Sequence, residues 1–332
     1  MPVSAALPRP ARLRRAGAAL AAALVLAGCG DTKGSSGDAP VDPAAARAAL
    51  GFSGDSALGY VRTALAFGTR VPGSAGHRAT GDWIVAQMKA RGAEVTEQAW
   101  THRAADGRTL PLRNILARFN PQATSRILYV THWDTRPVAE KETDPAKRAT
   151  PIAGANDGTS GIGLFLAIAD VLQRRAPTVG VDLLFVDGED YGSFDPTEVD
   201  VFLGSTHFAA NPPAPGYAPV FAIVWDMIGD RDLQLYQEGL SLNGAPEVVA
   251  RTWRRAEELG LSKWFVPQPK YTVRDDHVPL LAKGWRAIDV IDIDYPYHHT
   301  LADTIDKVSA ASLQIVGDVA VALIRDFDAP VP

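Results

Sequence analysis

Apolar residues recur along this chain at two spacings, and each spacing predicts a type of secondary structure. Apolar positions three or four residues apart predict helices over residues 56–67, 78–91, 159–174, 200–210, 245–260, 276–283 and 309–326. Short runs of apolar and β-branched residues predict strands over Ala93–Trp100, Asn114–Phe119, Ile127–Thr131, Val181–Val186, Val220–Trp225 and Ala287–Ile291. Because the later strands are almost wholly apolar and alternate with helices, we predict an α/β fold, a single α/β/α sandwich with a mostly parallel mixed sheet. It is expected to occupy residues 45–328.

The first 44 residues differ from the rest of the chain. A leader containing Arg9, Arg12, Arg14 and Arg15 precedes an apolar run of 13 residues, Ala16 to Gly28. This run is too short to span a bilayer and is typical of a signal peptide, here residues 1–28. Leu26-Ala27-Gly28-Cys29 is similar to a bacterial lipoprotein processing site, which makes Cys29 the expected lipidation site. An ordinary signal peptide with an incidental cysteine is the alternative.

Residues 29–44 are rich in Gly, Ser, Asp and Pro, and we expect them to form a flexible tether. The chain would then be lipid-anchored on the extracytoplasmic side of a bacterial membrane, facing the periplasm or the cell surface. Cys29 is the only cysteine, so the folded domain has neither an internal disulfide nor a catalytic thiol.

Composition and charge narrow the range of functions. The chain is 46% hydrophobic and 21% charged, which is ordinary for a globular protein and excludes disorder or a coiled coil as a description of the whole chain. Its net charge is −5, and removing the leader would take away four arginines and no acid. An acidic chain of this kind argues against nucleic acid as a partner.

Acidic residues and histidines follow the predicted strands where each strand ends. His132 and Asp134 come after the strand that ends at residue 131, Asp187, Glu189 and Asp190 after residue 186, and Asp226 after residue 225; the last strand leads toward the pair His298-His299, and Asp157 lies in a Gly-rich loop before a helix. In such sheets, ligands bind beyond the carboxyl ends of the strands. Each residue alone has a simpler explanation: Asp157, for example, could cap the helix that follows it.

Together, these side chains predict a metal site at the carboxyl edge of the sheet. Carboxylates gathered without a cation would repel one another and raise one another's pKa. Carboxylate and imidazole ligands, with no thiolate available, fit zinc best.

Seven short motifs, in order and covering almost the whole domain, carry a family resemblance. They are THWDT at 131–135, GANDGTSG at 154–161, DGEDYG at 187–192, GSTHF at 204–208, DMIGD at 226–230, RDDHVPLL at 274–281 and HHTLADT at 298–304. They resemble zinc peptidase family M28 and, within it, the glutaminyl cyclase-like branch. The resemblance implies an α/β/α sandwich that binds one or two zinc ions.

The resemblance also implies roles for individual residues. Asp157, Asp190 and His299 match the principal zinc ligands, while His132 and Asp226 match residues that complete a second zinc site in two-zinc aminopeptidases. Glu189 matches the general base and acid. Phe194 and His298 are expected to line the substrate pocket, although animal cyclases have Trp at the position of His298.

Two reactions share this machinery, and both act on peptide or protein N-termini. An aminopeptidase would hydrolyse the first peptide bond, whereas a glutaminyl cyclase would convert N-terminal Gln to pyroglutamate and release ammonia. Asp275 favours the cyclase, because cyclases of this family have an acid there that shares a network with the counterparts of Asp226 and Glu189. The simpler interpretation is that Asp275 caps the helix at 276–283. A third possibility is a binding protein that has kept the fold without the activity.

Overall fold

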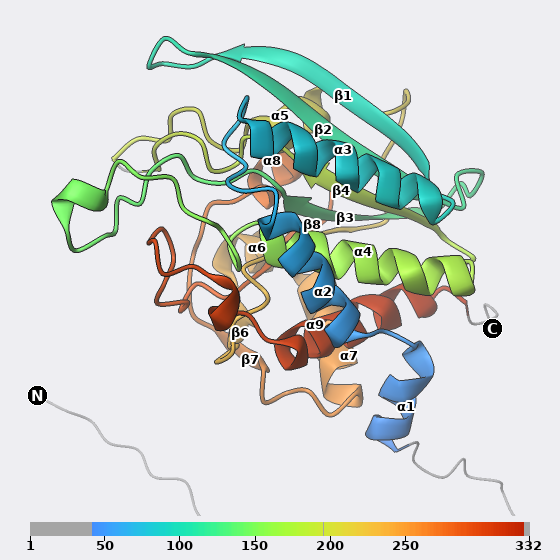
Figure 1. Ribbon diagram of the computed structural model, residues 1–332. Coiled ribbons are helices and arrows are strands. Elements are labelled where there is room, and N and C mark those ends of the chain that lie inside the picture. Colours follow the sequence, from blue (N-terminus) through green and yellow to red (C-terminus); the bar gives the residue numbers. More distant parts are fainter. Residues whose placement is uncertain (1–41, 195, 329–332) are drawn as a thin grey trace, which may run out of the picture. The chain divides into compact units, whose positions relative to one another are not determined.

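The structure is a computed structural model that describes residues 42–194 and 196–328 (Figure 1). The predicted signal peptide, Cys29 and nearly all of the predicted tether lie outside these residues. The first described helix, α1, spans Pro43–Leu50 and begins two residues before the predicted start of the domain. Asp42 explains this start, since its side chain accepts a hydrogen bond from the backbone N–H of Ala44.

A six-stranded sheet forms the centre of the domain. Its strands lie in the order β1-β2-β4-β3-β5-β8. Their bounds are Glu94–Arg103 for β1, Thr109–Phe119 for β2, Arg126–His132 for β3, Gly180–Val186 for β4, Ala222–Asp226 for β5 and Ala287–Ile291 for β8. Strands β4, β3, β5 and β8 pair in parallel, whereas β1 and β2 are antiparallel additions at one edge. This confirms the predicted mostly parallel mixed sheet.

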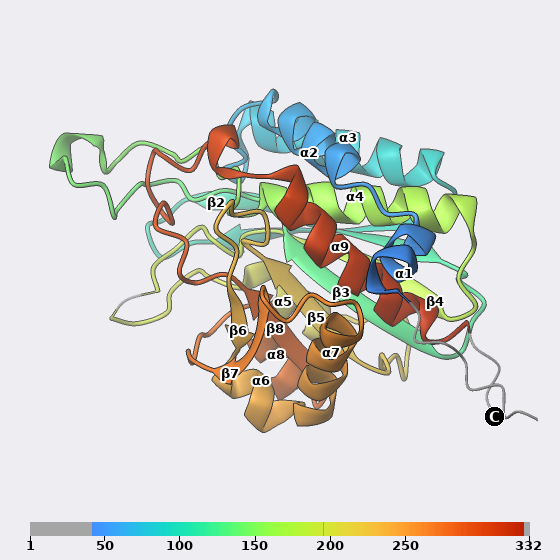
Figure 2. The same cartoon turned by 90° about the horizontal axis from the view of Figure 1, so that it is seen from below.

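Helices cover both faces of this sheet (Figure 2). In addition to α1 they are α2 (Gly54–Leu65), α3 (Ala75–Ala90), α4 (Thr159–Arg174), α5 (Leu203–Ala210), α6 (Gly239–Gly244), α7 (Pro246–Glu258), α8 (His277–Ala282) and α9 (Ala310–Arg325), with short 3-10 turns at Pro145–Lys147 and Ile305–Lys307. Apolar residues of α2, α3, α4, α7 and α9 pack on one face of the sheet, and those of α5 and α8 pack on the other. The predicted α/β/α sandwich is confirmed.

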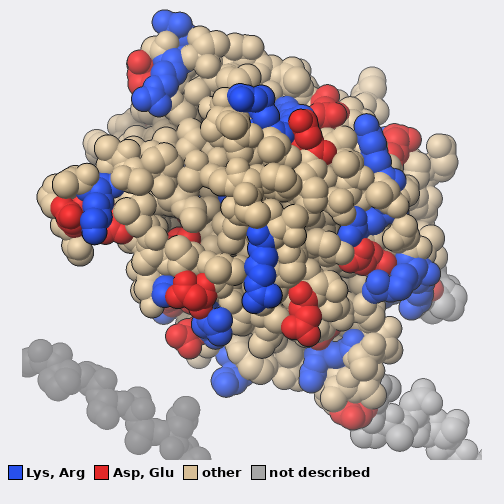
Figure 3. All heavy atoms as spheres, viewed as in Figure 1, with Lys and Arg blue, Asp and Glu red and all other residues tan. Residues whose placement is uncertain are grey.

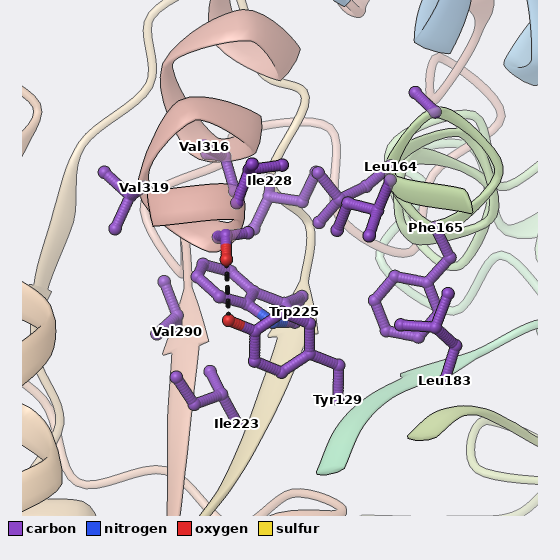
Figure 4. Packing of buried hydrophobic residues seen from close by; sticks show 14 of the residues in the cluster. Tyr129, Leu164, Phe165, Leu183, Ile223, Trp225, Ile228, Val290, Val316 and Val319 are labelled. Carbon is purple, nitrogen blue, oxygen red and sulfur yellow. Dashed lines mark hydrogen bonds between the residues drawn. The ribbon is translucent and has the colours of Figure 1, made fainter. Parts of the chain in front are cut away.

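Alternation along the strands explains how one sheet serves two cores. In β3, Ile127 and Tyr129 belong to the larger core, whereas Leu128 and Val130 point to the opposite face and the smaller core. Figure 4 shows Tyr129 and Trp225 between the sheet and helices α4 and α9. The hydroxyl of Tyr129 donates to the carbonyl oxygen of Ala320 at 2.8 Å, so this buried polar group is satisfied.

Some elements differ from the sequence prediction. A second, two-stranded sheet of β6 (Leu235–Gln237) and β7 (Phe265–Pro269), and helix α6 beside it, carry no clear periodicity and were not predicted. Helix α5 begins at Leu203 rather than at residue 200, because Asp200 and Phe202 have positive φ angles of 55° and 52°.

Charged side chains of both signs are spread over the face of the molecule in Figure 3. Lys and Arg are interspersed with Asp and Glu over the face in Figure 3, which has no extended basic patch. Within residues 42–194 and 196–328, no helix is long and apolar enough to cross a bilayer.

Candidate metal centre

The sheet topology brings the predicted polar residues together. Because β4, β3, β5 and β8 are parallel neighbours, their carboxyl ends lie at one edge. His132 and Asp226 are the last residues of β3 and β5, and Glu189 and Asp190 lie in the turn after β4. The loop after β8 carries His298 and His299, and Asp157 lies just before α4.

The first group of metal-ligand type comprises His132, Asp157 and Asp226. Nε2 of His132 lies 3.1 Å from Oδ1 of Asp157 and 3.1 Å from Oδ1 of Asp226. All three residues are buried, and their ligand atoms lie within 4.8 Å of one another. The resemblance assigned His132 and Asp226 to a second zinc site and Asp157 to the principal ligands, and the structure brings the three together.

The second group shares Asp157 and adds His299 and His298, again with ligand atoms within 4.8 Å of one another. Nε2 of His299 lies 3.7 Å from Oδ2 of Asp157 and 3.3 Å from Oδ1 of Asp190. The structure therefore places Asp157 and Asp190 beside His299, so the three predicted principal ligands lie together. It also places His298, which was predicted only to line the pocket, against them.

These residues fit a divalent cation. Buried polar atoms almost always have a hydrogen-bond partner, and a missing one costs about 1–3 kcal/mol. Yet Oδ2 of Asp157 and Oδ2 of Asp190 are buried without a hydrogen-bond partner among the residues described. Carboxylate oxygens and imidazole nitrogens are ligands that zinc accepts, so a zinc ion would satisfy free oxygens that the protein leaves unpaired.

Asp157 is positioned by its loop and does not cap α4. The N-cap of α4 is Gly158, with a φ of 82° and no side-chain cap. A Cβ on Gly158 would lie 2.8 Å from the carbonyl oxygen of Asp134 and 2.9 Å from Cε1 of His132, so only glycine permits this approach. Asp303 holds the loop by accepting from the N–H groups of Asn156 at 2.9 Å and Asp157 at 3.2 Å.

Glu189 lies beside the ligands with the properties expected of a proton carrier. It is 7% exposed, and its backbone N–H donates to Asp134, which also accepts from the N–H of Asp190. Burial raises the pKa of Glu189 well above its ordinary value, and the negative charges of Asp190 and Asp275 raise it further. A raised pKa favours the uptake of a proton by this carboxyl group, which is what a general base that later acts as an acid requires.

Asp275 interacts with Glu189 and Asp226 through charge. Burial, and then the charge of Asp226, raise the pKa of Asp275 to about 6. Its Oδ1 accepts from the backbone N–H of Asp276, but its Oδ2 has no partner within the described chain. The N-cap position of α8 belongs to Asp276, which makes no side-chain cap, so the simple capping interpretation of Asp275 is not what the structure has.

The site opens into a cavity of about 820 Å³. Glu189, Asp157, Asp226 and Asp275 form its acidic end, and its apolar lining is Phe194, Met227, Val273, Ile291 and Ile293. The guanidinium of Arg136 lies 5.1 Å above the ring of Phe194. Phe194 and His298 thus both line the cavity.

The sequence analysis missed a segment that holds the ligands in place. In segment 136–142, which follows β3, Arg136 donates to Oδ1 of Asp190 at 2.9 Å and to Oε2 of Glu140 at 2.7 Å. Glu140 in turn contacts Nδ1 of His299 at 2.5 Å. Although burial alone would raise it, contact with His299 and Arg136 lowers the pKa of Glu140 to about 2. In sequence the segment resembles any charged loop, so only its contacts reveal this function.

Comparisons with known proteins agree with this geometry. A model of peptidase family M28 matches residues 114–324. A glutaminyl-peptide cyclotransferase-like protein of Mus musculus is 26% identical over 262 residues, which cover 71% of this chain and 66% of that relative. The crystal structure of Porphyromonas gingivalis glutaminyl cyclase is 37% identical, with a TM-score of 0.80, and the match covers 84% of this chain and 99% of that one. A Zn-dependent exopeptidase from Parabacteroides distasonis is 35% identical, with a TM-score of 0.81 and the same coverage.

Proposed function

This chain belongs to peptidase family M28, and we propose that it is a zinc-dependent glutaminyl-peptide cyclotransferase. The family expected from the seven motifs is thereby confirmed, and the similar proteins include both a glutaminyl cyclase and an exopeptidase. The observation that carries the choice of cyclase is Asp275, a buried carboxyl group that lines the cavity and is coupled by charge to Asp226 and Glu189.

In the proposed reaction, the α-amine of an N-terminal Gln attacks the carbonyl carbon of its own side-chain amide. Asp157, Asp190 and His299 would hold the zinc, which supplies Lewis-acid polarisation of that carbonyl when bound. Glu189 takes a proton from the attacking amine and returns one to the leaving nitrogen. A C–N bond to the amine forms, the C–N bond of the amide breaks, and ammonia leaves without consumption of water.

The cavity suits this intramolecular step. The acidic end of the cavity would attract the substrate's amino group. The apolar lining would bury the methylene groups of the Gln side chain next to that amino group. Holding amine and amide at attack distance removes much of the entropic barrier, which is where a closely fitting pocket contributes most.

An aminopeptidase is the second candidate, and one observation favours it. The compact His132, Asp157 and Asp226 group would hold a second cation beside the first, and two neighbouring metal ions are suited to hydrolysis by water. Asp226 therefore has two proposed roles, as a ligand in this reaction and as a member of the Asp275 network in the cyclase.

The deciding experiment follows two peptides of equal length by mass spectrometry after incubation with the zinc-loaded protein. One peptide begins with Gln and the other with Leu. Loss of ammonia from the Gln peptide, with its length unchanged, is the expected result. Release of a free N-terminal residue would replace the cyclase with the aminopeptidase, and no change in either peptide would favour the binding protein.

We also propose peptide N-termini as the partners of this protein and the extracytoplasmic face of a bacterial membrane as its location. The basic leader, the apolar run and Cys29 support an anchor made by lipid alone. Labelling with a radioactive fatty acid in cells, compared between the wild-type chain and Cys29→Ser, tests this proposal. Equal labelling of both would overturn it.

A further inference from the structure

Two adjacent histidines at the site have opposite partners. Nδ1 of His299 contacts the carboxylate of Glu140 at 2.5 Å, whereas Nδ1 of His298 contacts the ammonium of Lys141 at 2.8 Å. A carboxylate only accepts hydrogen bonds and an ammonium only donates them. Nδ1 of His299 therefore carries a proton, while Nδ1 of His298 carries a lone pair.

These contacts at Nδ1 determine whether Nε2 of each ring carries a proton or a lone pair. His299 has its proton on Nδ1, so its Nε2 lone pair is free to bind a metal. His298 has its lone pair on Nδ1, so the proton of the neutral ring is on Nε2, and a nitrogen that carries a proton cannot bind a metal. Glu140 thus leaves Nε2 of His299 able to bind a metal, and Lys141 leaves Nε2 of His298 able to donate a hydrogen bond.

Both rings face the same cavity even though they are consecutive in the chain. His299 has a φ of 57°, and the two ring centroids lie 3.7 Å apart. The backbone N–H of Lys141 donates to the carbonyl oxygen of His299 at 3.3 Å, which holds the two segments together. A ring nitrogen of His298 lies within 4.8 Å of the ligand atoms of Asp157 and His299.

The surroundings need a hydrogen-bond donor. The ionisable groups at the acidic end of the cavity are carboxylates, including Asp157, Glu189 and Asp275. Two arginines line the same cavity, but Asp190 and Glu140 engage Arg136, and Glu198 engages Arg274. Nε2 of His298 has no hydrogen-bond partner within residues 42–194 and 196–328, so its N–H remains available to a bound molecule.

We propose that His298 donates its Nε2–H to the carbonyl oxygen of the amide that reacts, and that Lys141 is the positioning residue that fixes this tautomer. The inference rests on the proposed function only in requiring an amide substrate, because negative charge develops on this oxygen in cyclisation and in hydrolysis alike. His298 keeps its proton throughout, so the bonds made and broken are unchanged.

The test uses the full zinc-loaded chain and variants at both positions. His298→Ala removes the donor, and His298→Gln places an amide N–H where Nε2 was. Lys141→Met removes the ammonium with little change in length, and Lys147→Met is the matched control, since Lys147 lies in the same loop with an exposed side chain. Nitrogen-15 spectra of the histidine rings report the tautomer directly.

We expect an Nε2–H signal for His298 in the wild type and in Lys147→Met, and a mixture of tautomers in Lys141→Met. Zinc content should be equal in all variants. On whichever peptide reacts, kcat should fall about 100-fold in His298→Ala with little change in KM, and should recover in part in His298→Gln.

Three results would overturn the inference: an Nδ1–H ring in the wild type, zinc loss from His298→Ala, or an unchanged kcat in that variant. If neither peptide reacted, the proposed function would fall, and the Gln-initiated peptide would serve as a ligand instead. Failure of that peptide to shift the Nε2–H resonance of His298 would then overturn the inference.

Discussion

Glu140 contacts Nδ1 of His299 at 2.5 Å, which leaves Nε2 of the same ring facing Oδ1 of Asp190 at 3.3 Å. Carboxylates in this position orient a metal-binding histidine and make it a stronger ligand. The site therefore depends on a residue that no metal ion would touch.

Replacing Glu140 with Gln should weaken zinc binding about 10- to 100-fold, because the amide no longer supplies a negative charge to the ring. Competition with a chromophoric chelator measures this affinity. Glu142→Gln is the matched control: among the described residues, the Glu142 side chain accepts a hydrogen bond only from the backbone N–H of Leu301, at 2.8 Å, and the Gln side chain accepts it equally well. Equal loss of affinity in both variants would show a general disturbance of the loop.

Asp275→Asn should lose most of its turnover with its zinc content intact. Asp275 interacts with Glu189 and Asp226 through charge. The negative charge of Asp275 raises the pKa of Glu189, and the negative charge of Asp226 raises the pKa of Asp275. A neutral side chain would lower the pKa of Glu189 and impair its exchange of protons. Parallel kinetic and metal analyses check this, and loss of zinc from the variant would contradict the proposed network.

Removal of metal with a chelator should abolish turnover and lower the melting temperature. The buried carboxylates Asp157, Asp190 and Asp226 would then repel one another without a cation between them. Zinc should restore both properties and magnesium should not, since magnesium prefers oxygen ligands alone. For the cyclase we expect one zinc per chain by mass spectrometry under native conditions, and two would favour the aminopeptidase.

Asp318 of α9, which is not one of the metal residues, predicts a pH-dependent change in stability. Burial raises the pKa of Asp318 to about 6, although contacts with Gln314 and Arg47 oppose this rise. The folded state therefore holds the proton more tightly than the unfolded state, and stability is lost as pH rises from about 4 to about 6.

Asp318→Asn stays neutral at every pH and should be more stable than the wild type at pH 7.5, by about 1–3 kcal/mol. At pH 4 the two proteins should unfold almost together. Denaturant titrations at both pH values test this expectation. A difference of the same size at both would mean that the effect is one of packing and not of charge.

The strands and the polar residues at their ends could be predicted because the pattern of neighbouring residues indicates them. Strands such as β3 and β4 are buried on both faces, so they appear as continuous apolar runs, and the polar residues after them necessarily meet at one edge. His132 and Asp226 were predicted in this way and Asp157 from its Gly-rich loop before a helix, and the three do lie together.

The features of the site that the sequence analysis did not predict depend on contacts between segments far apart in the chain. Glu140 and Lys141 are 159 and 157 residues from their histidine partners and occupy a loop without periodicity. The role of His298 follows from the tautomer that Lys141 imposes, which no pattern of residue types encodes. Strands β6 and β7 were missed because strands this short carry too few alternating positions.

The span of the metal residues has a consequence for how the protein is made. They extend from His132 to His299, and the last of them follows β8, the sheet's final strand. A growing chain on the ribosome that has reached residue 290 already contains Glu140 and Asp190, but it still lacks both histidines of the pair. The three principal ligands that the resemblance implies are therefore complete only after the segment beyond β8 has been made.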